Sequence, residues 1–301
     1  MDFRSASYRN GLIGLGLIAA LLAGLAVLIH LLAASPFTLP AFGIAVGILI
    51  LVAALIALVY WTVATLGLSY RLDRNGVRIH WGASQTIVPI RSIQSIVPVE
   101  RAPTELGLRA AFRRRAWLGG WAAPVRLGDG RVAVLRANGD PAAALAILTE
   151  THAYLISPDR PAEFVDGWRD RRFLGTTQDW REEERRAGWL SLPIWTDRLT
   201  WGLMGGIVVT ALALFGTMAL VYERLPERLP LHFDVFGQPD RIGQRQEVLR
   251  LPVVALLFLL IDLGLGFVVY RRDRVAAYLI WAGAILLQLL AWGALYGIAT
   301  R

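Results

Sequence analysis

The sequence contains no cysteine and no lysine, and it is poor in charged residues of both signs. The absence of cysteine excludes disulfides, thiolate metal sites and a cysteine nucleophile, and it leaves the redox compartment open. Charged residues make up 18% of the 301 positions, whereas soluble domains usually carry about 25%. Because 55% of the residues are hydrophobic, this deficit predicts that part of the chain lies in lipid.

Five apolar stretches are long enough to cross a bilayer as helices. A spanning helix needs about 20 mostly apolar residues, because lipid offers the backbone no hydrogen-bond partners. The first stretch could instead be a cleaved signal peptide, but it exceeds the apolar core of such peptides, about 7 to 15 residues, which favours a retained span. The predicted spans are residues 11–33, 39–66, 199–222, 251–270 and 275–299.

The arginines predict the orientation of these spans, because basic residues are enriched in cytoplasmic segments. Arg4 and Arg9 precede the first span, residues 67–198 hold 20 Arg against 15 acidic residues, and Arg271, Arg272 and Arg274 separate the last two spans. The N-terminus is therefore predicted to be cytoplasmic and the C-terminus extracytoplasmic. The loop 223–250 carries five Arg and five acidic residues and is predicted to lie outside.

After the second span the hydrophobic pattern changes to the alternation typical of strands, beginning with Leu68, Tyr70 and Leu72. The dipeptide Asn75-Gly76 predicts a hairpin with a type I′ turn. Pro161 is expected to open a helix that runs to Arg172. Further strand-like runs, which bring the expected strands to seven, are residues 85–90, 117–127, 131–137, 143–148 and 153–156.

The end of this segment, Tyr-Leu-Ile-Ser-Pro-Asp at residues 154–159 followed by Pro161 and Phe164, resembles a bacterial pleckstrin-homology (PH) domain. The resemblance covers residues 68–172. It implies an all-β barrel capped by one C-terminal helix, which is a scaffold for binding rather than catalysis. A fold alone does not name the ligand.

Four arginines of this PH-like domain, Arg109, Arg113, Arg114 and Arg115, fall in a predicted loop between strands. They are lipid-facing candidates, since a basic residue near an anionic membrane surface contributes about 1 kcal/mol. The simpler interpretation, a solvated loop, is favoured because such charge runs are common on surfaces. A nucleic-acid interface would need a denser basic stripe and is not expected. Residues 176–198 mix Arg and Glu with tryptophans and predict an amphipathic juxtamembrane connector.

The loop after the third span carries a second motif. Residues 225–245 read Leu-Pro, Leu-Pro and His-Phe, followed by a Gly, an Asp and an Arg. This pattern resembles the SdpI-type domain, a membrane module of unknown general function found in bacterial toxin-immunity and signalling proteins. Leu229 stands where the family usually has Ile, and Arg245 stands at the usual Lys. The resemblance implies that residues 199–301 form such a module and that loop 223–250 is its working surface.

The binding candidates in this loop are His232, Asp234, Gly237, Asp240 and Arg245. The polar cluster is interpreted in three ways: a turn held by local hydrogen bonds and Asp-to-Arg pairs, a surface that recognises a protein or peptide, or a metal site. Local hydrogen bonding is the usual role of such loops. Because no second His lies nearby, no metal and no cofactor are predicted.

Asp262 lies deep within the fourth span, where an ionisable residue is costly and usually functional. Its candidate partners are Gln288 in the fifth span and His30 in the first. Two interpretations stand side by side: a protonated Asp hydrogen-bonded inside the helix bundle, or a member of a proton or ion relay.

Together these patterns predict a multi-pass protein of a prokaryotic plasma membrane with four parts. They are a two-helix anchor at 1–67, a cytoplasmic PH-like domain at 68–175, the connector at 176–198 and an SdpI-like three-helix module at 199–301. The fold class is therefore a membrane protein of five transmembrane helices with an inserted all-β PH-like barrel.

The expected function is binding and signalling, or immunity. The PH-like domain would bind a protein or an anionic lipid surface, and the outer loop would recognise an extracytoplasmic factor such as a protein or peptide. The alternative is a small transporter or channel component that uses Asp262. No HExxH, GxSxG or P-loop motif is present, so an enzyme is not expected. The sequence leaves the oligomeric state open.

Overall fold

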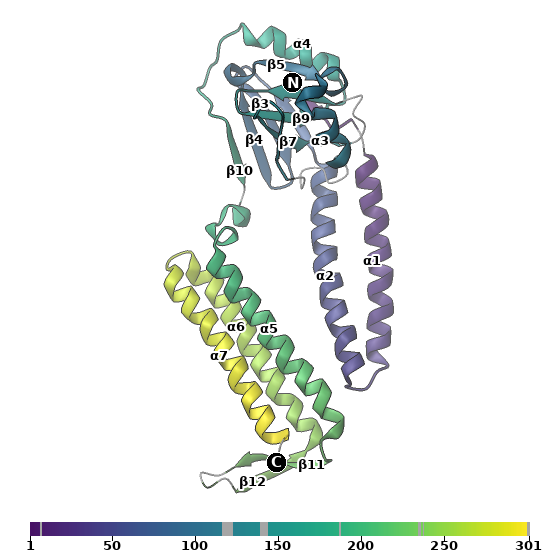
Figure 1. Cartoon of the computed structure of the whole chain (residues 1–301), viewed down its shortest axis with the longest axis vertical. Coiled ribbons are helices and arrows are strands. Elements are labelled where there is room, and N and C mark those ends of the chain that lie inside the picture. The colour runs from purple at the N-terminus through teal and green to yellow at the C-terminus, as the bar shows by residue number, and fades with distance from the viewer. Residues whose placement is uncertain are drawn as a thin grey trace. The chain divides into compact units, whose positions relative to one another are not determined.

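The computed structural model describes residues 1–6, 8–115, 123–138, 144–186, 188–233, 236 and 238–299, with elements labelled in Figure 1. This part of the chain contains five helices long and apolar enough to cross a membrane. They confirm the five predicted spans to within a few residues, so the chain is a membrane protein. The helices are α1 (Arg9–Ala33), α2 (Leu39–Leu66), α5 (Arg198–Val221), α6 (Arg250–Tyr270) and α7 (Arg274–Ala299).

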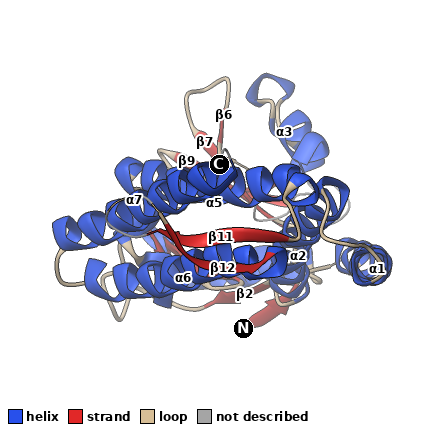
Figure 2. Cartoon of the chain, turned by 90° about the horizontal axis from the view of Figure 1, so that it is seen from below, coloured by secondary structure: helices blue, strands red, loops and turns tan. Residues whose placement is uncertain are grey.

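The other elements are mainly short strands, drawn in red in Figure 2, with two shorter helices, α3 (Leu108–Arg115) and α4 (Pro161–Arg172). The architecture is thus a mixture of helices and sheets. The described strands are β1 (Asp2–Arg4), β2 (Ser69–Leu72), β3 (Gly76–Trp81), β4 (Ser84–Pro89), β5 (Ser95–Pro98), β6 (Val125–Arg126), β7 (Val132–Arg136), β8 (Leu145–Leu148), β9 (His152–Ile156), β10 (Glu183–Arg186), β11 (Arg228–Phe233) and β12 (Pro239–Gln244).

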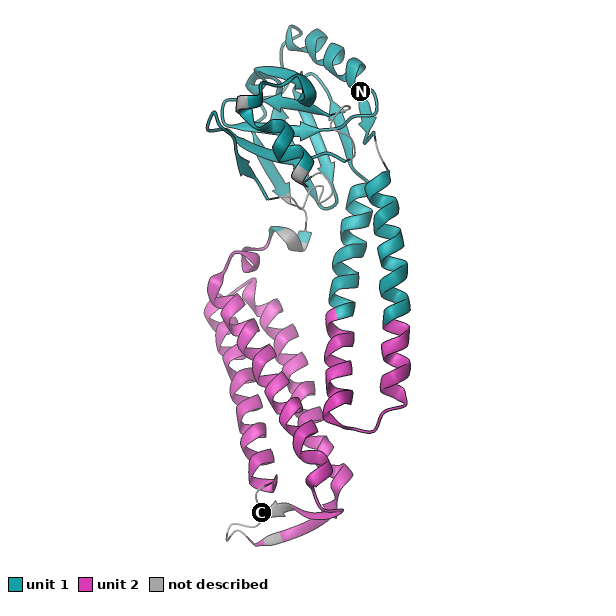
Figure 3. Cartoon of the chain, turned by 45° about the vertical axis from the view of Figure 1, so that its right-hand side comes forward, with its two compact units in different colours: residues 1–24, 51–191 teal, residues 25–50, 192–301 magenta. Residues whose placement is uncertain are grey.

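The chain forms two compact units, coloured separately in Figure 3. Unit 1 comprises residues 1–24 and 51–191, and unit 2 comprises residues 25–50 and 192–301. The division passes through α1 and α2, so each unit includes a part of both helices.

The described strands of unit 1 form two five-stranded sheets and do not close into one barrel. The first sheet has the order β1-β2-β3-β4-β10, and the second has the order β5-β8-β9-β7-β6. In the second sheet β7 and β9 run parallel, whereas the other pairs of both sheets are antiparallel. The predicted barrel is therefore not supported. Three strands that alternation did not reveal lie at sheet edges: β1 and β10 at the two edges of the first sheet, and β5 at one edge of the second.

The hairpin predicted at Asn75-Gly76 joins β2 to β3, but its turn is not type I′. Leu72 pairs with Val77, so four residues form the connection, and Asn75 does not have the positive φ that a type I′ turn requires. The Asp73 carboxylate instead accepts hydrogen bonds from the Asn75 and Gly76 backbone N–H groups at 2.7 and 3.2 Å. Gly76 is needed because a Cβ there would lie 2.1 Å from the Val88 carbonyl oxygen.

A buried polar network joins the two sheets of unit 1. The Tyr70 hydroxyl on β2 donates to the Arg136 carbonyl at 2.8 Å and accepts from the Ser157 N–H at 3.1 Å. Burial raises the pKa of Tyr70 to about 12, so its hydroxyl keeps its proton at neutral pH. Phe164 and Trp168 of α4 are buried in the same core as Tyr70, which agrees with the expected packing of the C-terminal helix.

In unit 2, α7 packs against both α5 and α6. Asp197 precedes α5 and accepts hydrogen bonds from the Leu199 and Thr200 N–H groups, and also from the hydroxyls of Tyr270 on α6 and Tyr278 on α7. One carboxylate therefore joins the ends of all three helices. Further along the bundle Trp281 is fully buried against Gly266, which brings α6 and α7 close together.

Candidate functional site

The loop after α5 folds into the hairpin β11–β12, which runs across one end of the α5–α6–α7 helices (Figure 2). Leu229 of β11 is only 2% exposed and packs with Met218, Val248 and Leu295 of the helical part. The register shifts next to Pro230, a residue that sheets tolerate at edges and bulges. The hairpin is thus fixed at its base by apolar contacts.

Two large apolar side chains of this hairpin are exposed, one in the turn and one on β12 close to the base. Ile242 of β12 is 68% exposed, and Phe236 between the two strands is 85% exposed. Contiguous exposed apolar surface rimmed by polar residues marks interaction sites. The hairpin therefore combines a buried residue at its base, Leu229, with exposed apolar side chains at Phe236 and Ile242.

Glu247 organises the junction between the hairpin and α6. Its side chain accepts from the Gln244 N–H at 3.2 Å, completing a capping box at the start of a short 3₁₀ helix, Arg245–Leu249. Its other oxygen, Oε2, lies 2.9 Å from an Arg241 nitrogen and 3.2 Å from an Arg250 nitrogen. Two guanidinium groups thus share one carboxylate, which leaves the junction with a net positive charge.

A groove of about 560 Å³ opens beside this junction. Its mouth is formed by Arg241, Glu247 and Arg250, and its walls are apolar side chains of α6 and α7 together with Val248 of the 3₁₀ helix. The apolar wall residues are Val248, Leu251, Val254, Ala255, Phe258, Leu287, Leu290, Ala291, Ala294 and Ile298.

The predicted loop residues occupy different parts of this arrangement. The Arg245 N–H donates to the Glu227 carbonyl at 2.9 Å, and its guanidinium lies 5.0 Å from the ring centre of Tyr222, so Arg245 closes the base of the hairpin. Asp240 lies on β12 with an exposed side chain. His232 lies on β11 opposite Arg241. The side chain of His232, together with Asp234 and Gly237, lies outside the described residues.

Sequence reasoning missed the three charged residues at the groove mouth. Arg241 and Glu247 are six positions apart on different elements, so only the folded hairpin brings them together. Glu247 and Arg250 are three positions apart at a helix start, where such pairs face each other. The spacing of Glu247 and Arg250 is the sequence signal that could have indicated this charged cluster.

Within the membrane-spanning part of unit 2, Asp262 is half-buried and makes no hydrogen bond or ion pair with any described residue. No hydrogen bond joins it to Gln288, whose amide N–H instead donates to the Ala255 carbonyl at 2.9 Å. The Gln288 Oε1 atom is buried and has no hydrogen-bond partner among the described residues. His30, the other suggested partner, is exposed on α1.

The arginines of the PH-like domain lie on a helix and not in a loop. Leu108 and Phe112 of α3 are buried in the core, whereas Arg109 and Arg113 are exposed. The two residues of each pair are four positions apart, so Leu108 and Phe112 share the buried face of the helix and Arg109 and Arg113 share an exposed face. Arg114 and Arg115 continue the same helix, and their side chains lie outside the description.

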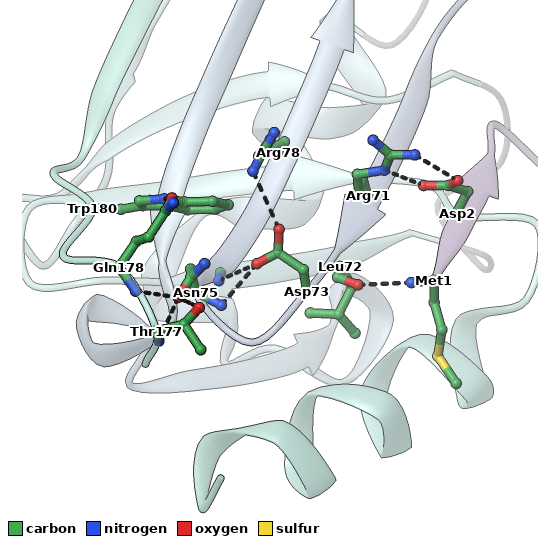
Figure 4. A network of polar contacts seen from close by, with 11 residues as sticks. Met1, Asp2, Arg71, Leu72, Asp73, Asn75, Arg78, Thr177, Gln178 and Trp180 are labelled. Carbon is green, nitrogen blue, oxygen red and sulfur yellow. Dashed lines mark hydrogen bonds and ion pairs between the residues drawn. The ribbon is translucent and has the colours of Figure 1, made fainter. Parts of the chain in front are cut away.

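A segment that follows α4, residues 177–186, binds along the PH-like domain, and we call it the strap. Figure 4 shows its first part: the Asn75 side-chain oxygen accepts from the Thr177 N–H, the Thr177 hydroxyl and the Gln178 N–H at 2.9 to 3.0 Å. The Trp180 ring then covers the Arg78 guanidinium at 4.3 Å. Asn75 is therefore an anchor for the strap.

The second part of the strap contacts both sheets of unit 1. Strand β10 pairs with β4 of the first sheet. The carboxylate of Glu182 accepts from the Tyr154 hydroxyl of the second sheet at 2.7 Å and lies 2.9 Å from the His152 ring nitrogen. Glu184 lies 3.2 Å from a guanidinium nitrogen of Arg136. Part of the predicted connector is thus an edge strand of the domain.

Comparison with known protein families gives matches to two regions of the chain. Residues 68–172 match the family described as Bacterial PH domain, which is the range of the resemblance. Residues 209–256 match the family described as Domain of unknown function (DUF1648), and this range contains the hairpin β11–β12. The second match names no activity, so an SdpI-type identity remains a proposal.

One curated relative, an uncharacterized protein of Archaeoglobus fulgidus, is 45% identical over 56 residues. The match covers 18% of this chain and 31% of the relative, so the chain spans about a third of that protein. No solved structure matches the chain. The family matches and the five apolar helices together show a membrane protein that carries a PH-like domain.

Proposed function

We propose that this chain is a membrane-anchored binding protein of the signalling or immunity type, and not an enzyme. Its hairpin β11–β12 recognises a protein or peptide factor on the outer face of a prokaryotic plasma membrane. The observation that supports this most directly is the combination of a fixed hairpin base at Leu229 with exposed apolar side chains at Phe236 in the turn and at Ile242 on β12. An SdpI-type module would account for the hairpin and for α5, α6 and α7.

The PH-like domain is the second binding module of the proposal, on the cytoplasmic face. Arg109 and Arg113 lie together on the exposed face of α3, so this helix offers a basic surface to an anionic lipid or an acidic protein. Each such arginine would contribute about 1 kcal/mol near an anionic surface.

Photo-crosslinking in cells tests recognition by the hairpin. A photoreactive amino acid at Ile242 is expected to capture an extracytoplasmic protein or peptide. The same probe at Val275, also exposed but at the start of α7, serves as the matched control. A probe at Ile242 that captures the same species as the probe at Val275 would exclude a specific partner at the hairpin.

The absence of cysteine makes the proposed orientation directly measurable. Gln238→Cys between β11 and β12 is expected to react with a membrane-impermeant maleimide in intact cells. Ser191→Cys, which precedes α5, is expected to react only after permeabilisation. The reverse pattern would place the hairpin in the cytoplasm and would refute an outer recognition surface.

A small transporter or channel component is the second candidate, favoured by Asp262 and by the Gln288 oxygen inside the spans, which has no partner among the described residues. Ionisable residues inside membranes commonly mark ion or proton paths. Proton or cation flux into proteoliposomes of the pure chain, abolished by Asp262→Asn, would establish it. Equal flux with the wild type and with Asp262→Asn would remove it.

A further inference from the structure

The groove beside the hairpin has two chemically different parts that belong together. Its walls, on α6 and α7, are apolar, and its mouth carries two arginines and one glutamate. We propose that this groove binds one phospholipid with an anionic headgroup, with an acyl chain between α6 and α7 and the phosphate at Arg241 and Arg250. The inference rests on the proposed function, since it assigns a ligand to the same face of unit 2.

The dimensions of the wall suit part of an acyl chain. On α6 the lining runs from Leu251 to Phe258, seven helical steps of about 1.5 Å, or roughly 10 Å along the helix. On α7 it runs back from Ile298 to Leu287. Ala291 and Ala294 lie on this wall, and their small side chains leave the room that a chain needs.

The mouth suits a phosphate. The side chains of Arg241 and Arg250 are 61% and 71% exposed, and each is joined to Glu247 through one nitrogen. A guanidinium has five N–H donors, so both arginines retain donors for a phosphate, which arginine recognises with two parallel hydrogen bonds. Two cations against one carboxylate leave one positive charge, which favours an anionic over a zwitterionic headgroup.

A lipid fits the groove better than a peptide does. The walls between α6 and α7 consist of apolar side chains, so the backbone N–H and C=O groups of a peptide would lose water without gaining partners. An acyl chain has no such groups. The neighbouring Val253, Leu257 and Leu286 are exposed apolar residues of the spans, so the groove opens toward lipid.

Because Arg241 belongs to the hairpin and Arg250 to α6, a headgroup held by both would connect the two elements. The lipid would then form part of the surface that the hairpin presents. A bound phospholipid would accordingly stabilise the position of the hairpin β11–β12, which is the recognition surface of the proposed function.

Native mass spectrometry of the full chain in detergent tests the inference, with phosphatidylglycerol and phosphatidylcholine of identical acyl chains as probes. The wild type is expected to retain one phosphatidylglycerol and to prefer it over phosphatidylcholine. The double variant Arg241→Gln/Arg250→Gln is expected to lose about tenfold in phosphatidylglycerol affinity, since charge-assisted bonds to phosphate are among the strong ones. Arg224→Gln, another exposed arginine that lies outside the groove lining, is expected to bind as the wild type does.

Filling the groove tests the acyl-chain part separately. Ala294→Phe is expected to lower the retention of both lipids, whereas Ala282→Phe, on an exposed part of α7 outside the groove, is the matched control. Thermal unfolding in the same detergent verifies that both variants are folded. If Ala294→Phe proves unfolded, Ala291→Leu, a smaller change on the same wall, replaces it.

Equal binding of both lipids by the wild type, or unchanged binding by the Arg241/Arg250 variant, would overturn the inference. Retention of lipid by a folded groove-filling variant would do the same. Crosslinking at Ile242 shows whether the proposed recognition function fails together with lipid binding or independently of it. A partner captured there by a chain that binds no lipid leaves the proposed function standing, and lipid binding without a partner refutes the recognition proposal alone.

Discussion

The two units of this protein achieve their specific structures by different means. In unit 1, polar side chains join segments that are far apart in the sequence, as when Tyr70 bonds to residues 136 and 157 and Asn75 binds the strap. In unit 2, Asp197 and Glu247 each hold a cluster of polar contacts at helix ends. Between these ends the helices pack closely, with single hydrogen bonds such as the one from Gln288 to the Ala255 carbonyl.

This difference follows from the elements that make these contacts, which are sheets in unit 1 and membrane helices in unit 2. A sheet obtains its backbone hydrogen bonds from neighbouring strands, so distant segments must be held in register. A membrane helix satisfies its own backbone, and helix association then depends on close packing at small residues. The contact between Gly266 and Trp281 is such a site.

Gly266→Ala is expected to destabilise unit 2 by about 3 kcal/mol, the upper end of the cost of overpacking. A Cβ at this position would lie 2.0 Å from the indole nitrogen of Trp281. The matched control is Gly264→Ala, where nothing lies within 4 Å of the new atom, and the better helix propensity of Ala leaves it neutral or stabilising. Thermal unfolding in detergent measures both, and equal stability of the two variants would contradict the packing account.

Tyr70→Phe is expected to destabilise unit 1 by about 2 kcal/mol, because it leaves the buried Ser157 N–H without its acceptor. Tyr8→Phe, at an exposed tyrosine, is the control and is expected to change stability little. Chemical denaturation monitored by near-ultraviolet circular dichroism measures the difference. An unchanged unfolding midpoint for Tyr70→Phe would show that the network between the sheets contributes nothing.

Glu182→Ala is expected to cost about 1 kcal/mol, since it removes the acceptor of the Tyr154 hydroxyl. The loss should be local, so the amides of β10 should exchange with solvent faster while those of β3 stay protected. The control is Glu183→Ala, whose side chain is exposed and pairs with Arg185. Faster exchange in the control than in Glu182→Ala would argue against a role of the inward-facing carboxylate.

The smallest effect is expected from acid. The hydroxyls of Tyr278 and then Tyr270 hold the pKa of Asp197 well below its usual range, although burial acts in the opposite direction. The folded unit therefore favours the carboxylate, and its contribution is fully present above the usual Asp pKa, about 4. It is lost as the pH falls below that value and through the lower folded pKa.

Unfolding midpoints of the detergent-solubilised chain between pH 7 and pH 3 measure this contribution. Asp197→Asn should flatten the acid dependence. Asp273→Asn, which alters a carboxylate that caps only α7, should keep the dependence of the wild type. A wild-type slope that persists in Asp197→Asn would assign the acid sensitivity to other groups.

The spans and the PH-like segment were predictable because their signals are local. A run of 20 apolar residues, or alternation on either side of Asn75-Gly76, is contained within a short window. Strands β1 and β10 were not, because Asp-Phe-Arg and Glu-Glu-Arg-Arg carry no hydrophobic alternation and become strands only by pairing with Arg71 and Ile87. Helix α3 was mistaken for a loop, although Leu108 and Phe112 have helical spacing.

The candidate site was predictable only in part. The motif pointed to the hairpin and to Arg245, but the groove depends on α6 and α7 packing side by side, and Arg241 reaches it only through the hairpin register. The position of Asp262 within an apolar span singles it out in the sequence, whereas no sequence pattern indicates the bond between Gln288 and Ala255. Such a bond depends on the rotation of one helix against another.

The placement of β1 also has a consequence for biosynthesis. Residues Asp2–Arg4 leave the ribosome before α1 and α2, yet they pair with Ser69–Arg71, which are made after both helices. The first sheet therefore stays incomplete until two membrane segments have been synthesised, and β10 joins it later still. Translation through the membrane machinery and folding of the PH-like domain are accordingly coupled, and a ribosome that stalls within α2 would leave β1 without its partner.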